Sequence, residues 1–367
     1  MSTEGGNNVH VLYIQGRASK AGAQTCLERL MRSQELLPFT PVLLVGEEGW
    51  LTSACRDNGI PVICIDFPSS RSVFSLLYKN NLFANRVVSE LKRLGIQPTI
   101  IHANDHNESL LGLVLKRILE VPLVLFVRSP SMSIHDFQKY KCASSDYIIA
   151  VGDEIQERVQ GWTTGHQIDC TYDAIYPEEV MAPLNCKKAV PNHLLIIGSH
   201  LDWKGWADLT EALFLSQLGG KVITEVSFTG KRPDKELNDL GLERFLGVKF
   251  NFLGHTEDFV NLVRGFQLVI NPSRQETFGM AAVEVVASGV PLLTTRVGVM
   301  EKFIKDVRFL SNPSDPSDLS DKLLKILMYW GDFNMFTVVE SSQDGIRDQF
   351  NINKTAKEIK RNYLDLI

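Results

Sequence analysis

The 367-residue sequence has no long hydrophobic run. No apolar stretch approaches the ~20 residues that a membrane-spanning helix needs, and the N-terminus, MSTEGGNNVH, lacks the apolar core of a secretion signal. The sequence also lacks a basic tail or stripe, because 38 Lys and Arg are mixed along the chain with 43 Asp and Glu. These absences argue against a membrane-spanning protein and against a nucleic-acid partner, and they favour a cytoplasmic location.

Metal-binding and common nucleotide-binding signatures are missing as well. The six cysteines form no C-x-x-C pair and have no metal-ligand spacing, so we interpret them as buried or incidental thiols in a reducing compartment and expect no metal site. There is no G-x-G-x-x-G fingerprint, which disfavours a nicotinamide-dependent dehydrogenase. The only lysine in the first glycine-bearing loop is misplaced for a Walker A loop.

What the sequence does contain is a series of short apolar segments that alternate with helical patterns. Residues 9–14, 41–45, 61–65, 99–103, 123–128 and 147–151 each read as a buried strand. Such alternation predicts an α/β fold with parallel sheets covered by helices on both faces. The length suits two domains, and the Gly-, Pro- and Thr-containing stretch at 161–191 marks a boundary near residue 175.

Two glutamates flank the start of one predicted helix. Residues 267–270 read as a strand, N-P-S at 271–273 ends it, and residues 280–287 read as a small-residue helix that G-V-P at 289–291 closes. Glu276 then lies at the carboxyl end of a parallel strand, where doubly wound sheets bind ligands. Glu284 lies on the helix, about 12 Å further if the whole span were helical. The helix N-terminus between them suits a phosphate, although an isolated E-x7-E is more often two surface glutamates.

The sequence around these glutamates resembles a known signature. E-T-F-G-M at 276–280, the second glutamate, and A-S-G-V-P at 287–291 together resemble the donor site of retaining glycosyltransferase family 4, which has the GT-B fold. The resemblance implies that Glu276 contacts the transferred sugar and that Glu284 bonds the ribose hydroxyls. It also implies donor contacts from the intervening residues, which are Thr277, Phe278, Gly279 and Met280.

A second segment, G-S-H-L-D-W-K-G at 198–205, resembles the family's G-R-L-x-x-x-K-G loop, in which Arg and Lys neutralise the diphosphate. Lys204 is retained, but Ser199 stands at the arginine position. One of two cations expected to stabilise the leaving group is therefore missing, and such preorganised charge is usually a large catalytic term. His200, Arg17 and Arg274 are the replacements that the sequence offers.

Two loops of the first half also bear on the site. A-G-A-Q at 21–24 resembles the family's G-G-A-Q loop and implies backbone contacts from Gly22 and Ala23 to the diphosphate or the sugar. H-A-N-D-H at 102–106 follows a strand, where the family often has a histidine that bonds the donor sugar. We expect His106 to be exposed to the ligand and Asn104 to stand at the family's histidine position, while a loop capped by Asn and Asp is the alternative. Arg128, at the end of its own strand, is a candidate for an anionic part of the acceptor.

The resemblance implies two doubly wound Rossmann-like domains facing across a cleft. Residues 1–175 would form the acceptor-binding domain, and residues 176–345 the domain that binds the nucleotide sugar. Residues 346–367 would form a C-terminal helix that returns to the first domain.

The implied function is a retaining, metal-independent transfer of a hexose-type sugar from a nucleotide diphosphate sugar, the co-substrate, to a glycan or lipid-linked acceptor, as in polysaccharide biosynthesis. No further cofactor is implied, and Glu276, Lys204 and His106 are the catalytic candidates. A sugar-nucleotide epimerase of the same fold is one alternative. A non-catalytic nucleotide-sugar-binding subunit is another, because Ser199 replaces the expected arginine.

The sequence leaves the base, the sugar, the acceptor and the oligomeric state open. Basic residues between 71 and 94, of which Arg71 is the first, would allow peripheral contact with anionic lipid at the inner membrane face. A solvated helix face is the other interpretation of the same residues.

Overall fold

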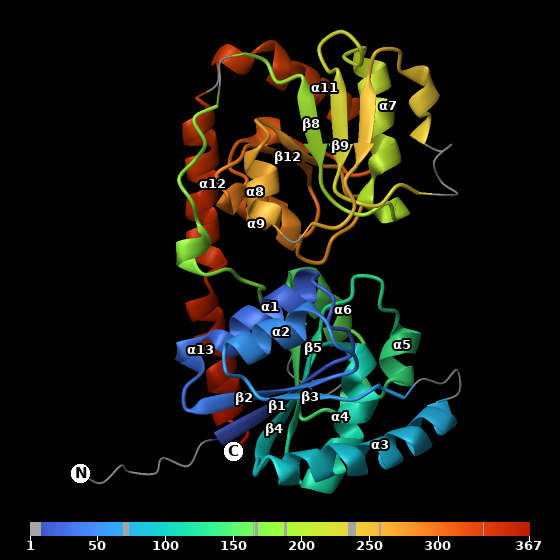
Figure 1. Cartoon of the computed structure of the whole chain (residues 1–367), viewed down its shortest axis with the longest axis vertical. Coiled ribbons are helices and arrows are strands. Elements are labelled where there is room, and N and C mark those ends of the chain that lie inside the picture. Colours follow the sequence, from blue (N-terminus) through green and yellow to red (C-terminus); the bar gives the residue numbers. More distant parts are fainter. Residues whose placement is uncertain are drawn as a thin grey trace, which may run out of the picture. The chain divides into compact units, whose positions relative to one another are not determined.

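The computed structural model describes residues 9–68, 73–163, 165, 168–186, 189–233, 240–256, 258–332 and 334–367, without the side chains of 73–78. The chain divides into two compact units, one formed by Met1–Ile175 with Ile352–Ile367 and the other by Tyr176–Asn351. Each unit is built on a parallel sheet with surrounding helices, which confirms the predicted fold class (Figure 1). Most of the polar N-terminus and Arg71 lie outside the described residues.

The sheet of the first unit has the strand order β3-β2-β1-β4-β5-β6-β7, and all neighbouring strands run parallel. The chain builds the sheet outward from β1 in one direction and from β4 in the other, so the switch point lies between β1 and β4. The strands are β1 (Val9–Gln15), β2 (Phe39–Val45), β3 (Val62–Cys64), β4 (Pro98–Ala103), β5 (Leu123–Val127), β6 (Tyr147–Val151) and β7 (Ile168–Thr171).

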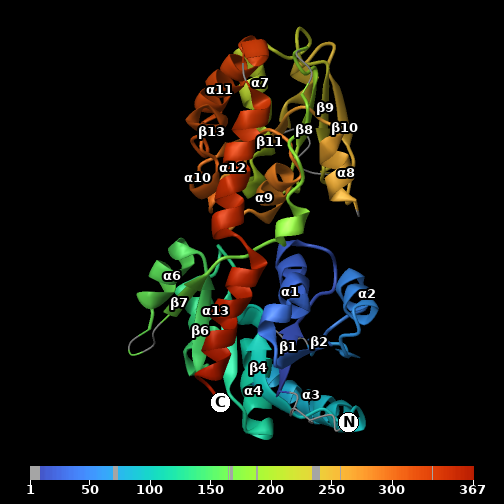
Figure 2. The ribbon, with the colours of Figure 1, turned by 90° about the vertical axis from the view of Figure 1, so that its left-hand side faces the viewer.

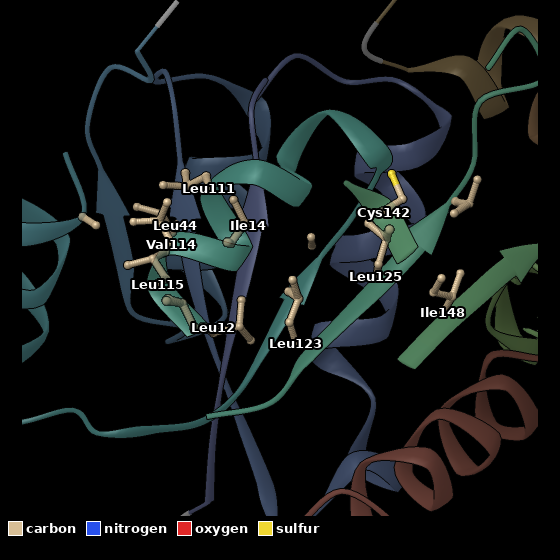
Figure 3. Packing of buried hydrophobic residues seen from close by; sticks show 14 of the residues in the cluster. Leu12, Ile14, Leu44, Leu111, Val114, Leu115, Leu123, Leu125, Cys142 and Ile148 are labelled. Atoms are coloured by element: carbon tan, nitrogen blue, oxygen red, sulfur yellow. The ribbon is translucent and has the colours of Figure 1, made fainter. Parts of the chain in front are cut away.

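Alternating side chains of these strands fill two apolar layers. Leu12 and Ile14 of β1 belong to a buried cluster on one face of the sheet, together with Leu111 and Leu115 of a covering helix (Figure 3). The helices of the first unit are α1 (Gly22–Arg32), α2 (Trp50–Asp57), α3 (Val73–Arg93), α4 (Ser109–Leu119), α5 (Ile134–Lys139), α6 (Asp153–Gln160) and α13 (Ile352–Leu364). The period of two along a strand sends Tyr13, between those β1 residues, to the opposite face.

Helix α13 belongs to the first unit and lies along it (Figure 2). A buried chain of polar side chains on that opposite face attaches it. Nδ1 of His102 lies 2.5 Å from the hydroxyl of Tyr363, which donates to the hydroxyl of Tyr13 at 3.1 Å. Burial lowers the pKa of His102 to about 3, so the imidazole is neutral. The returning segment begins at Ile352 rather than at 346, because the preceding helix continues in the second unit to Gln349.

The sheet of the second unit has the strand order β10-β9-β8-β11-β12-β13, with its switch point between β8 and β11. The strands are β8 (His193–Ile196), β9 (Glu225–Phe228), β10 (Lys249–Phe252), β11 (Val269–Asn271), β12 (Leu292–Thr295) and β13 (Leu310–Ser311). The helices are α7 (Trp206–Ser216), α8 (Phe259–Arg264), α9 (Met280–Ala287), α10 (Met300–Phe303), α11 (Pro316–Met328) and α12 (Met335–Gln349). Over the described parts of both units, every helix is too short or too polar to cross a membrane.

Candidate functional site

Two loops of the second unit meet at the switch point of its sheet. The loop after β8 ends in a 3-10 turn, Asp202–Lys204, and the loop after β11 carries Glu276. Nζ of Lys204 lies 2.6 Å from Oε1 of Glu276. Because β8 and β11 are parallel neighbours, their carboxyl ends open at the same edge of the sheet, and this brings together two side chains that are 72 positions apart.

The carboxylate of Glu276 has a second partner. The buried hydroxyl of Ser273 lies 2.8 Å from Oε1 of Glu276 and 2.9 Å from Oδ1 of Asn271, so its single proton can be donated to either oxygen. The carbonyl of Ser273 in turn accepts from the hydroxyl of Thr295 at 2.5 Å. Neighbouring strands thus fix the loop that presents Glu276.

Arg274 ties the two loops together. Its guanidinium contacts Asp208 at 2.6 and 2.7 Å and Asp202 at 2.7 Å, and its backbone N–H donates to the carbonyl of Trp203 at 2.7 Å. The hydrogen bonds that the guanidinium donates to Asp208 are the main reason that the pKa of Arg274 lies above its ordinary value. Since its charge is neutralised by two carboxylates, Arg274 does not replace the cation missing at Ser199.

Glycine is required where this loop enters α9. Gly279 has a φ of 95°, a left-handed conformation that favours glycine. A Cβ at this position would lie 2.1 Å from Cε of Met300, so the end of that side chain would have to move. The G in E-T-F-G therefore reflects both backbone conformation and close packing.

The predicted donor contacts around the start of α9 divide into two kinds. Phe278 is 3% exposed and packs edge-to-face against Phe350 with ring centroids 5.0 Å apart, and Met280 is also buried. Any donor contact from these two residues must therefore use their backbone groups. Thr277, Gly279, Glu284 and also Ser199 of the β8 loop are half-buried.

In the first unit, Asn104 organises the switch point between β1 and β4. It is fully buried, and its amide donates to Oε1 of Gln15 at 2.5 Å and to the carbonyl of Ala23 at 3.5 Å. Asn104 thus holds the end of β1 and the first turn of α1, where Gly22 is exposed and Ala23 is half-buried. This arrangement makes Asn104 a support for the α1 loop, in contrast to the direct ligand contact expected from its position.

His106 is buried instead of exposed as expected, with 7% of its surface accessible. Oδ1 of Asp105 accepts from the backbone N–H of His106 at 2.8 Å and from its Nδ1 at 2.9 Å, and the ring packs edge-to-face on Tyr140. Burial alone would lower the pKa of His106, but the hydrogen bond and charge of Asp105 raise it overall. The contact with Asp105 fixes the proton on Nδ1 and leaves Nε2 as the group that can meet a ligand.

Arg128 is buried rather than open to an acceptor. Its Nε donates to the carbonyl and to Oδ1 of Asn104, both at 3.1 Å, and its guanidinium forms an ion pair with Asp173. In this pairing the carboxylate of Asp173 compensates the buried charge of Arg128. The expected direct contact of Arg128 with an anionic acceptor conflicts with this neutralisation.

Sequence reasoning missed Glu108, which completes the β1/β4 switch point. Its Oε1 accepts from the backbone N–H of Gly16 at 3.0 Å, while its Oε2 is buried without a partner among the described residues. Burial, reinforced by the charge of Asp105, raises the pKa of Glu108 to about 7. The only signal in the sequence was its position five residues beyond a strand end at a ligand-binding edge.

Comparison with known proteins finds a family model that matches most of the second unit. Residues 191–328 match the family model described as glycosyl transferases group 1, and this segment contains Lys204, Glu276 and Glu284. We call residues 191–328 the group 1 domain, after the family model that they match. The group 1 domain therefore contains the ion pair at the switch point, the Ser273 support and the α9 entry.

Relatives at the sequence level are glycosyltransferases. An uncharacterized glycosyltransferase of Methanocaldococcus jannaschii is 24% identical over 302 residues, which cover 73% of this chain and 76% of that protein. The lipopolysaccharide glucosyltransferase of Escherichia coli is 29% identical over 178 residues, which cover 47% of each chain. The match to the second relative thus spans about half of its length.

Solved structures match over almost the whole chain. Anabaena HepE in complex with UDP and glucose has a TM-score of 0.74 at 18% identity and covers 97% of this chain and 99% of its own. A glycosyltransferase from Rickettsia africae has a TM-score of 0.76 at 17% identity, with 98% and 99% covered. At these identities the likeness shows the fold, which is the GT-B fold predicted from the sequence.

Proposed function

We propose that this protein transfers a hexose-type sugar from a nucleotide diphosphate sugar to a hydroxyl of a glycan or lipid-linked acceptor, with retention at the anomeric carbon. The observation that carries the proposal is the Lys204–Glu276 pair at the β8/β11 switch point, beside the start of α9. A cation, a carboxylate and a helix N-terminus at one sheet edge match the charges of a diphosphate and the hydroxyls of a sugar.

UDP is the nucleotide we propose for the donor. The support is the Anabaena structure of the same fold, which contains UDP and glucose. Glu284, on the half-buried side of α9, would accept hydrogen bonds from the ribose hydroxyls.

In the proposed reaction the bond between the anomeric carbon and the diphosphate oxygen breaks, and the acceptor oxygen bonds the same carbon on the same face. The acceptor proton goes to the departing diphosphate. Lys204 and the free N–H groups of α9 stabilise the negative charge on that leaving group. Glu276, held by Ser273, orients the sugar through its hydroxyls.

This chemistry assigns the neutralisation of the diphosphate to protein groups, and we propose that it needs no metal ion. Transfer measured in excess EDTA should then proceed at the rate seen without EDTA. A rate that falls with EDTA and returns with Mg²⁺ or Mn²⁺ would refute the metal-independent assignment.

The test of the function begins with thermal unfolding in UDP, GDP, ADP, CMP and their common sugars. A ligand at a hundred times its Kd stabilises the native state by about 2.7 kcal/mol, which a melting curve resolves. Stabilisation by one nucleotide class that is lost in Glu284→Ala supports the donor site and the ribose contact. Stabilisation that persists in Glu284→Ala removes the ribose assignment.

A non-catalytic nucleotide-sugar-binding subunit is the second candidate, because Ser199 stands where the resembling loop has arginine. It would bind a nucleotide sugar without transfer or hydrolysis. A sugar-nucleotide epimerase would interconvert the donor with no acceptor present. Incubation of the stabilising nucleotide sugar with and without acceptor, followed by chromatography of the sugars, separates the three activities.

A further inference from the structure

The loop after β8 presents Lys204 as its phosphate-binding cation, with Ser199 at the position where the resembling loop has arginine. Lys204 already shares its charge with Glu276, and Arg274 is held by two aspartates. If the group 1 domain binds a diphosphate at this edge, further positive charge has to come from another strand. The neighbouring strand β9 ends in the sequence T-G-K-R-P, which carries Lys231 and Arg232.

The register of the sheet places this segment beside the β8 loop. Strands β8 and β9 are parallel, with Ile196 opposite Phe228. The same register, continued beyond the strands, sets Gly198 level with Gly230 and Ser199 level with Lys231.

Hydrogen bonds show that the two loops stay side by side beyond the strands. The backbone N–H of Gly198 donates to Oγ1 of Thr229 at 3.0 Å, and the same hydroxyl lies 3.1 Å from the carbonyl of Gly198. A Cβ added at Gly230 would come within 3.1 Å of that carbonyl. These contacts show that the β8 and β9 loops are still adjacent at Gly198 and Gly230. Ser199 and Lys231 are the next residues of the two loops.

Lys231 and Arg232 are both exposed. No carboxylate in the described part of the chain forms an ion pair with either of them, whereas Arg274, Arg296 and Arg308 of the same unit each have one. Their charge is thus available at the carboxyl edge of the sheet, which is the edge that carries Lys204.

We propose that Lys231 and Arg232 supply the phosphate-binding charge that Ser199 lacks, by contacting the diphosphate of the nucleotide from the end of β9. The inference rests on the proposed function and extends it, because it assigns a binding role to two residues outside the family signature. It places the diphosphate between the β8 and β9 loops as well as at the start of α9.

The test is calorimetric titration of the full-length wild type and of Lys231→Ala/Arg232→Ala with UDP and GDP, and with uridine and guanosine as partners that lack the diphosphate. Loss of charge-assisted hydrogen bonds should weaken binding of the diphosphate about ten- to hundredfold and leave nucleoside binding unchanged. The control is Lys221→Ala/Lys325→Ala, which removes the same charge from exposed positions of the same unit and should bind like the wild type.

A rescue separates this role from a general change in charge. Ser199→Arg in the Lys231→Ala/Arg232→Ala background restores a cation level with Lys231 and should recover most of the lost UDP affinity. A wild type that binds neither diphosphate overturns the proposed function together with this inference. A wild type that binds UDP or GDP, with unchanged affinity in the double variant, overturns this inference alone.

Discussion

At the residue scale, the chemistry proposed for the second unit depends on an ion pair between two side chains. Lys204 and Glu276 are 2.6 Å apart, and both side chains remain partly accessible to solvent. In the proposed function, a diphosphate carries more negative charge than one carboxylate and would compete with Glu276 for the lysine. This competition would release the carboxylate for the hydroxyls of the sugar, so binding and orientation are coupled through one side chain.

Replacing Lys204 by alanine should reduce kcat about 10²–10³-fold, because the main cation that stabilises the leaving group is removed. The fold should be kept, since Glu276 retains the hydroxyl of Ser273 as a partner and its carboxylate is partly accessible to water. Steady-state kinetics with a saturating nucleotide sugar measure the effect, with Lys325→Ala as the control. Near-normal turnover in Lys204→Ala would show that another residue neutralises the diphosphate.

Glu108 gives the first unit a pH-dependent stability. The pKa of its carboxyl is about 7 in the folded chain, against an ordinary value of 4.5, because burial disfavours the charged form. Between these values the folded protein binds a proton that the unfolded chain has lost. The free energy of unfolding from this group is therefore highest below pH 4.5 and falls as the pH rises to about 7.

Glu108→Gln should remove that fall, because an amide keeps the acceptor for Gly16 and does not ionise. Relative to the wild type, the variant should gain on the order of 1–3 kcal/mol between pH 5 and pH 8. Urea unfolding at the two pH values measures the gain, with the exposed Glu178→Gln as control. An equal stability difference at both pH values would contradict the raised pKa.

At the element scale, α13 is attached to the first unit by the His102–Tyr363–Tyr13 chain. The hydroxyl of Tyr363 is the only acceptor in the described residues for the proton on Nδ1 of His102, whose Nε2 has no partner there. The chain is buried throughout, so its groups cannot turn to water if one member is removed. A helix distant in sequence is thereby fixed to the central strands β1 and β4.

Tyr363→Phe should destabilise the protein by about 1–3 kcal/mol, the cost of leaving a buried donor without an acceptor. Chemical unfolding that follows the first unit measures this cost. Tyr329→Phe is the matched control, because Tyr329 is 52% exposed and its hydroxyl can bond water. Equal unfolding midpoints for the two variants would mean that the buried chain does not stabilise the attachment of α13.

At the scale of the whole molecule, hydrophobic periodicity and the Gly and Pro residues that end helices and strands predicted the secondary structure well. The partners of individual side chains were harder to predict. The predicted helix at 280–287 coincides with α9, because Gly279 before it and S-G-V-P after it mark both ends. Burial of His106 and the pairing of Arg128 with Asp173 could not be predicted, since both depend on residues far apart in the chain. Local sequence patterns specify strands and loops. Which side chains pair with each other depends on which loops the fold brings together.

The dependence on distant residues also explains why the sequence located the polar site at the switch point of the second unit but missed Glu108 at that of the first. Glu276 belongs to a contiguous signature with its own helix, so sequence alone located it. Glu108 and Gly16 come together only because β1 and β4 are neighbours in the sheet. No local sequence pattern predicts that these two strands pair. Both units nevertheless place polar side chains at the switch point, where the doubly wound fold leaves space for a ligand.

The most direct test of the account is a crystal structure of the full chain with UDP. The diphosphate should lie within hydrogen-bonding distance of Lys204 and of the first N–H groups of α9, with the ribose at Glu284. UDP bound away from this edge, with Lys204 still paired to Glu276, would contradict the account.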